Sequence, residues 1–162
     1  MHHPTNKSKI LSNHYVIVPI MATLSFISMY VLMYSMVNTS NNIYNNINQV
    51  YMAALMTAPM VIFEITLMRS MFKKNKLNIV IIAISLVVLV ASFAFIREQT
   101  AVNDEQFIMS MIPHHSSAIL MCEQATIQDP ELKELCEAIL ANQQAEIEQM
   151  KEILARMQGT TP

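Results

Sequence analysis

Three long apolar stretches constrain the fold of this chain more than any other feature of its sequence. Residues 15–37 carry no charge, residues 50–72 contain only Glu64 and Arg69 as charged groups, and residues 77–96 are dense in isoleucine, valine and leucine. Each stretch is long enough to cross a hydrocarbon core of ~30 Å as an α-helix. The first is too long for a secretory signal peptide. We therefore predict a membrane domain with three transmembrane helices over residues 1–96, followed by a second domain over residues 97–162.

Basic residues flank these spans unevenly. They lie before the first span and between the second and third, at Lys7, Lys9, Arg69, Lys73, Lys74 and Lys76, whereas residues 38–49 carry no charge. Because basic residues are enriched in cytoplasmic loops, we expect a cytoplasmic N-terminus and an exported C-terminal domain. The expected location is a bacterial inner membrane with a periplasmic C-terminal domain, and the lipid bilayer is the first partner.

Glycine is almost absent, since Gly159 is the only one. This excludes phosphate-cradling loops and the nucleophile elbow of hydrolases, and it leaves little turn chemistry for β-hairpins. An all-α fold is therefore expected, and no enzyme is predicted. The net charge of −2 gives no basic surface for nucleic acid.

Methionine is the residue type in excess, with 15 in the chain. In the second span, Met52, Met56, Met60, Glu64 and Met68 recur every four residues and share one helix face. Such a stripe suits helix–helix packing, with Glu64 protonated or paired with Arg69. The alternative is a path for a cuprous ion, because thioethers are soft ligands and an ionisable residue at membrane depth points to function.

Two further helices are predicted after the spans. Residues 103–127 have an amphipathic pattern, with Pro113 removing the hydrogen bond that the Met109 carbonyl would accept. Asp129, Pro130 and Glu131 form a helix start, and the second helix should end before Gly159. No glycine or proline separates the third span from residue 103, so one continuous helix is an alternative.

The inner faces of these two helices follow from their periodicity. The first face comprises Phe107, Met111, His114, Ala118, Met121, Cys122 and Ala125, with His115 beside it. The second comprises Leu132, Leu135, Cys136, Ile139, Leu140, Gln143, Ile147, Met150, Leu154 and Met157. Two such helices bury little surface alone, so a four-helix bundle made by a homodimer is expected.

An antiparallel hairpin that reverses near Asp129 pairs residues whose numbers sum to about 258. Cys122 then faces Cys136, and His115 faces Gln143. A disulfide is the leading interpretation for the cysteines, because exported domains permit one. Simple burial and thiolate ligation of a metal remain alternatives.

His114 and His115 with Met111, Met121 and Cys122 form the most informative cluster. Imidazole and thioether together favour copper, in particular Cu(I), and silver would bind similarly. Zinc is possible through the histidines and cysteines. The competing interpretation is that both histidines form hydrogen bonds within an ordinary helical core and bind no metal.

These residues resemble a known family. Asp104, Phe107, Met111, Ile112, Pro113, His114, His115, Ala118, Ile119 and Met121 follow the D-x-x-F-x-x-x-M-I-P-H-H-x-x-A-I-x-M signature of the domain-of-unknown-function family number 305. Its second half matches Asp129, Pro130, Ile139, Gln143, Glu146, Ile147 and Met150. The resemblance implies a helical domain that binds copper or silver in the periplasm. It implies roles for Met111, His114, His115, Met121, Gln143, Glu146 and Met150, whereas the cysteines lie outside the signature.

The sequence therefore predicts a non-enzymatic, membrane-anchored protein that binds Cu(I) or silver for buffering, delivery or resistance. The expected ligands are His114, His115, Met111 and Met150, with Met121 as a further candidate, and Gln143 and Glu146 orienting the imidazoles. Other copper-handling proteins are possible partners. The alternatives are a metal-free interaction bundle and a subunit of a metal transport system.

Overall fold

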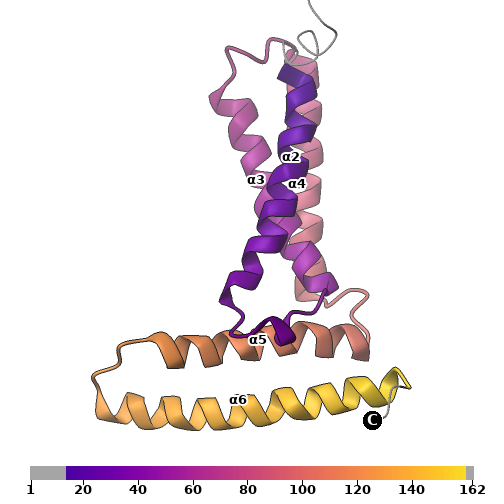
Figure 1. Ribbon diagram of the computed structural model, residues 1–162. Helices are drawn as coiled ribbons and strands as arrows, with labels where there is room; N and C mark the ends of the chain where they lie inside the picture. The colour runs from indigo at the N-terminus through magenta and orange to yellow at the C-terminus, as the bar shows by residue number, and fades with distance from the viewer. Residues whose placement is uncertain (1–13, 160–162) are drawn as a thin grey trace, which may run out of the picture. The chain divides into compact units, whose positions relative to one another are not determined.

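The computed structural model describes residues 14–159, and all its regular elements are helices (Figure 1). The long helices are α2 (His14–Leu32), α3 (Ile47–Leu67), α4 (Asn75–Arg97), α5 (Asp104–Gln124) and α6 (Pro130–Met157). Two short 3-10 helices, η1 (Met33–Met36) and η2 (Ser40–Asn42), lie between α2 and α3. Within the described residues there is no strand, so the predicted all-α class with three apolar helices followed by two more is confirmed.

The chain divides into two compact units. One contains α2, α4 and α3 from Val50 onwards, and the other contains Met33–Gln49 together with the chain from Ala101. The second unit therefore combines two segments that are far apart in the sequence. Nothing in the sequence patterns assigned Met33–Gln49 to the C-terminal domain.

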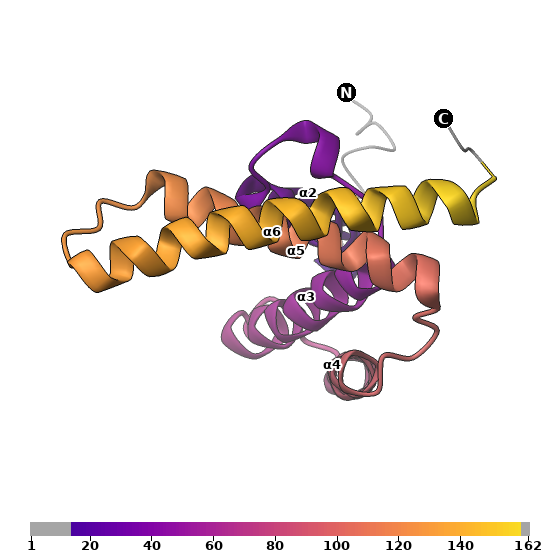
Figure 2. The ribbon, with the colours of Figure 1, turned by 90° about the horizontal axis from the view of Figure 1, so that it is seen from below.

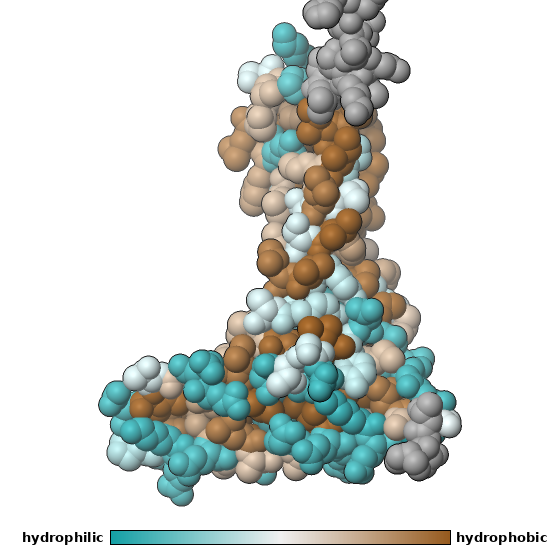
Figure 3. Space-filling view, viewed as in Figure 1, coloured by the Kyte–Doolittle hydropathy of each residue, from teal (hydrophilic) through white to brown (hydrophobic). Residues whose placement is uncertain are grey.

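Three helical segments, most of whose residues belong to the first unit, are long and apolar enough to span a membrane: His14–Met36, Ile47–Leu67 and Asn75–Arg97. The second ends at Leu67, before the predicted end at residue 72, so Arg69 lies beyond the helix. Large apolar side chains make up much of the visible surface of these helices, with residues of intermediate hydropathy between them (Figure 3). Such a surface suits contact with lipid rather than water.

Small and polar residues form the buried side of α4. Its buried positions are Asn78, Ser85 and Ser92, at seven-residue intervals. Small residues at such intervals let membrane helices approach closely. In the same unit, Val18 of α2 packs with Val61 and Ile65 of α3.

Helices α5 and α6 form the predicted hairpin and lie side by side in both views (Figures 1 and 2). Asn103 caps α5, because its Oδ1 accepts a hydrogen bond from Gln106 N at 2.8 Å. Asp129 caps α6 through Leu132 N at 2.9 Å, with Pro130 in the first turn. The start of α6 confirms the predicted signal at Asp129, Pro130 and Glu131, and α5 begins where its amphipathic pattern does.

The third span does not continue into α5. Gln99 and Ala101 adopt positive φ angles of 49° and 59°, and the chain turns between Arg97 and Asp104. The left-handed region is costly for residues with a Cβ atom, so glycine usually occupies such a turn; here Gln99 and Ala101 occupy it, and the break leaves no glycine signal in the sequence.

The buried face of α5 differs from the predicted one. Ile108, Ile112 and Ile119 pack against Ile147 and Leu154 of α6, whereas the predicted core residues Phe107, His114 and Met121 are exposed. Helix α5 contacts both α6 and the η1–η2 segment, so its apolar surface is wide. On α6, Leu132, Leu135 and Met157 are likewise exposed. Periodicity alone cannot choose between neighbouring rows of a wide apolar surface.

Candidate metal centre

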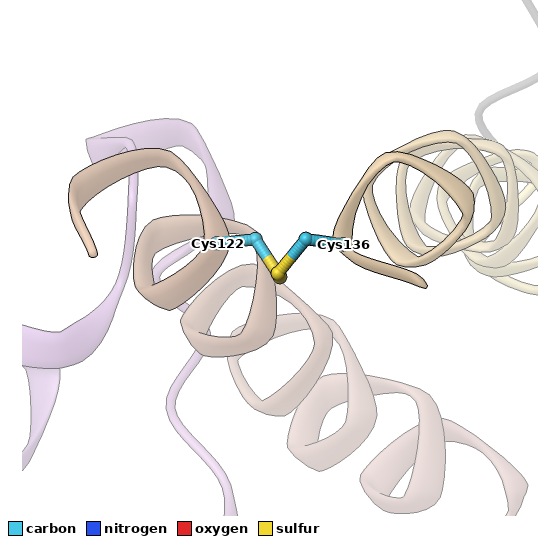
Figure 4. Close-up of a disulfide and its surroundings, with 2 residues drawn as sticks. All are labelled: Cys122 and Cys136. Carbon is cyan, nitrogen blue, oxygen red and sulfur yellow. A yellow bond between two sulfur atoms is a disulfide. The ribbon is translucent and has the colours of Figure 1, made fainter. Parts of the chain in front are cut away.

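A disulfide between Cys122 and Cys136 fixes the register of the hairpin near its turn (Figure 4). The two Cα atoms lie 5.5 Å apart, and the residue numbers sum to 258, as the sequence predicts. The described residues contain no free cysteine. Both sulfur atoms are therefore occupied, and thiolate ligation is not available while this bond is intact.

Two turns further from the hairpin bend, His115 faces Glu146. His115 Nδ1 lies 3.0 Å from Glu146 Oε2, and the two side chains are 13% and 51% exposed. Nδ1 is buried and, apart from this contact, has no hydrogen-bond partner among the described residues. The carboxylate oxygen therefore lies beside Nδ1, which makes Nε2 the ring atom that a metal would bind.

Gln143, the predicted partner of His115, lies one turn earlier on α6. Its Oε1 atom is buried without a hydrogen-bond partner within residues 14–159. The predicted pairing of His115 with Gln143 is therefore replaced by one with Glu146, a difference of less than one helical turn. An unpaired buried amide oxygen beside this site is an acceptor that a rotated ring or a bound water could satisfy.

Protonation of His115 is controlled mainly by burial, which lowers its pKa because the charged ring loses hydration. The Glu146 carboxylate acts in the opposite direction, and His114 lowers the pKa further. Burial prevails, so His115 is neutral near pH 7. A neutral imidazole has the free lone pair that metal binding requires.

His114 lies next to this ring. The two ring centroids are 6.0 Å apart with an interplanar angle of 58°, and His114 is exposed. Met111 precedes His114 by three residues and His115 by four, so all three side chains share one patch of the helix surface. Imidazole and thioether donors are therefore adjacent on α5.

The observed register adds a second thioether from α6. His115 and Glu146 have numbers that sum to 261, and so do Met111 and Met150. Met150 therefore lies across from Met111, one turn from the His115 contact. Both methionines are half-buried, and Met150 packs against the apolar core. Met121 is 53% exposed and lies two turns from His114.

Within residues 14–159, no group of three His, Cys, Asp or Glu side chains converges to hold an ion. A hard or borderline ion such as zinc would need such a group. A site in one chain would instead combine imidazoles with thioethers, which are the donors that Cu(I) and Ag(I) prefer.

The segment between α2 and α3 supports α5 directly behind the histidines. Ser116 is fully buried, accepts a hydrogen bond from Asn38 N at 2.9 Å, and donates one to Asn38 Oδ1. Asn42 Nδ2 lies 3.4 Å from Ser116 Oγ. Asn38, Asn42 and Ser116 were not predicted from the sequence. The signal that could have identified them is the loop over residues 38–49, which is rich in asparagine and carries no charge.

Asn46 complements the proline of the M-I-P-H-H stretch. Residue 113 is a proline and has no N–H, so the carbonyl oxygen of Met109 lacks its usual helical donor. Asn46 Nδ2 lies 3.4 Å from this oxygen and donates to it instead. Ile47 N also donates to Gln106 Oε1 at 2.8 Å. The segment thereby satisfies polar groups of α5 and holds the helix that carries both histidines.

The methionine stripe of α3 does not form an internal path. Met52, Met56, Met60 and Met68 are each at least 36% exposed. Glu64 makes no ion pair with Arg69 within the described part of the chain, and its Oε2 is buried without a hydrogen-bond partner. Neither packing inside one chain nor pairing with Arg69 accounts for the stripe.

Comparison with known proteins agrees with the resemblance seen in the sequence. The profile of a domain of unknown function, DUF305, matches residues 93–160. An uncharacterized protein of Acanthamoeba polyphaga mimivirus is 34% identical over 119 residues, which cover 72% of this chain and 76% of that protein. No solved structure matches the chain. The chain belongs to the DUF305 family, with its family domain formed around α5 and α6.

Proposed function

We propose that this protein binds Cu(I) or Ag(I) at the His115 site of a membrane-anchored helical hairpin. The contact between His115 Nδ1 and Glu146 Oε2 at 3.0 Å carries the proposal. Histidines that bind metals usually present one ring nitrogen to the ion and the other to a carboxylate or carbonyl. Lowering of the His115 pKa by burial supports it further, because the neutral ring is the ligand form.

The donor set consists of His115, His114, Met111 and Met150. Met121 is more remote, and Glu146 and Gln143 orient the imidazoles instead of binding the ion. Soft thioethers favour Cu(I) and Ag(I) over zinc, and the cysteine sulfurs are held in a disulfide. When bound, such an ion would be held by this set as cargo, for buffering, delivery or resistance.

We expect the hairpin on the outer side of the membrane, and such a location suits this role. The basic residues between α3 and α4 favour a cytoplasmic position for that loop, so a three-span topology predicts the hairpin on the opposite side. The disulfide suits an oxidising compartment. A bacterial inner membrane and transfer of the ion to other copper-handling proteins remain predictions of this proposal.

The test is a titration of the full chain in detergent with Ag(I), and with Cu(I) in ascorbate, against a competing chelator. We expect stoichiometric binding that His115→Ala abolishes. Glu146→Gln should weaken affinity by roughly 10–100-fold, as expected for a residue that orients a ligand. Met150→Leu should weaken it too.

Matched controls remove the same chemical groups elsewhere. His14→Ala removes an imidazole from the first unit, and Met157→Leu removes an exposed thioether from the end of α6. Both should leave affinity unchanged. Absence of binding by the folded wild-type chain, or equal binding by His115→Ala, would reject the proposal and favour a metal-free interaction bundle.

A further inference from the structure

An amphipathic pocket of about 360 Å³ lies where the chain passes from α3 to α4. Its polar lining comes from Thr66, Arg69, Asn75 and Asn78. Its apolar lining comes from Ile65, Ile79 and Ile82. Because α3 and α4 are membrane-spanning candidates, the loop that joins them lies at the surface of the bilayer.

This loop and the first turn of α4 are rich in basic residues. Arg69, Lys73, Lys74 and Lys76 fall within eight residues, and the nearest acid before them in the sequence is Glu64, whose Oε2 is buried. Arg69 makes no ion pair with any residue that the structure describes. A guanidinium presents a planar fork of donors that matches a phosphate, so Arg69 is the strongest candidate for recognising an anion.

Hydrogen bonds hold the loop in a defined conformation. Tyr15 OH donates to Asn78 Oδ1 at 2.9 Å and accepts from Lys74 N at 2.7 Å. Asn78 Nδ2 donates to the carbonyl oxygen of Phe72 at 2.7 Å. Lys74 Nζ lies 5.7 Å from the centre of the Tyr15 ring. These bonds fix Asn78, one of the four polar lining residues, and the backbone of the loop before any ligand binds, which lowers the ordering cost of binding.

We propose that this pocket binds one anionic phospholipid. The phosphate group contacts Arg69 and Asn75, and an acyl chain lies along Ile79 and Ile82, because Ile65 is buried at the base of the pocket. A soluble anion would gain nothing from the apolar wall, and a neutral lipid would leave the charge of Arg69 unmatched. A lipid with a net negative headgroup pairs its phosphate with Arg69 and packs an acyl chain against the isoleucines. Anionic lipids are also attracted to basic segments beside membrane spans.

The test measures lipid retained by the full chain in native mass spectrometry, with phosphatidylglycerol and phosphatidylcholine of identical acyl chains. The wild type should retain one phosphatidylglycerol per chain, preferred by about tenfold, as expected for a hydrogen-bonded charge pair. Arg69→Gln should abolish the preference. Lys76→Gln removes an equal charge from the same loop without lining the pocket, and should keep it.

Three results would overturn the proposal. Equal losses in Arg69→Gln and Lys76→Gln would indicate diffuse attraction to the basic loop. Equal retention of both lipids would indicate an apolar groove only, and displacement by millimolar inorganic phosphate would indicate a site for a free anion. If Arg69→Gln does not fold, Arg69→Lys is measured instead, because lysine keeps the positive charge but lacks the planar guanidinium. If Arg69→Lys prefers phosphatidylglycerol as strongly as the wild type does, the proposal is also rejected.

Discussion

At the scale of single residues, His115 links the packing of the hairpin to its chemistry. The ring is nearly buried between two helices, yet its Nδ1 atom lies beside a half-exposed carboxylate. Burial disfavours the charged ring more than Glu146 favours it, so the net pKa is lowered. The same burial that stabilises the hairpin thus keeps the imidazole in its metal-binding form.

This lowered pKa predicts a pH dependence of stability for the metal-free protein. The unfolded chain binds a proton at the ordinary histidine pKa of 6.5, while folded His115 binds it only at lower pH. Between these values the unfolded state holds more protons, so stability falls as pH drops below 6.5 and is lowest below the folded pKa. Hydrogen exchange of α5 amides at a series of pH values measures this. His115→Gln should flatten the dependence, and an unchanged slope would contradict the assignment.

Ser116 provides a second prediction at this scale. Its hydroxyl is fully buried and bonds to Asn38, so Ser116→Ala leaves the Asn38 N–H without a partner. We expect a loss of about 1–3 kcal/mol in the opening free energy of α5 amides, the usual cost of an unsatisfied buried group. Ser117→Ala is the control, because Ser117 Oγ bonds only the local Pro113 carbonyl. Its effect should stay within about 0.5 kcal/mol.

At the scale of elements, the helices were predictable and the surroundings of α5 were not. Caps at Asn103 and Asp129 and the Cys122–Cys136 register depend on local signals or on simple hairpin geometry. Packing of the asparagine-rich segment on α5 depends on non-local contacts of uncharged side chains, which leave no periodic pattern. The Met109 carbonyl shows the difference: Pro113 predicts that it lacks its helical partner, but only the structure identifies Asn46.

The disulfide gives a prediction that separates a structural role from a metal-binding one. It joins positions 14 residues apart and closes the hairpin at its bend. Replacing both cysteines by serine should destabilise the hairpin by roughly 2–4 kcal/mol, mainly by freeing the unfolded chain. Affinity for Ag(I) should remain, because the proposed ligands lie two turns away. Loss of Ag(I) binding from a folded double variant would show that the sulfurs contribute to the site.

At the scale of the whole molecule, the composition of the second unit agrees with a three-span topology. Met33–Gln49 and the hairpin belong to the same unit, so both would lie on one side of a membrane that the apolar helices span. The chain between them contains two candidate spans, α3 and α4, and two crossings return it to the side it left. Contacts such as Asn38 with Ser116 would be impossible if only one of these helices crossed the bilayer.

The last prediction concerns a second copy of the chain. Phe107, His114 and Met121 form an exposed row on α5 at seven-residue intervals, and the first and last are 51% and 53% exposed. Seven-residue spacing is typical of a seam between helices, and a second hairpin would cover it to complete a four-helix bundle. Light scattering of the full chain in detergent should therefore give the mass of a dimer.

A double substitution in this row tests which surface forms the dimer. Phe107→Glu with Met121→Glu should give monomers with intact helices, because neither side chain belongs to the core of one hairpin. Met157→Glu, which places the same charge on another exposed methionine outside the row, should remain dimeric. Since His115 and Glu146 meet within one chain, the monomer should still bind Ag(I) through His115. If the monomeric variant binds a different number of Ag(I) ions per chain than the wild-type dimer, the exposed His114 rings of two copies contribute to a shared site.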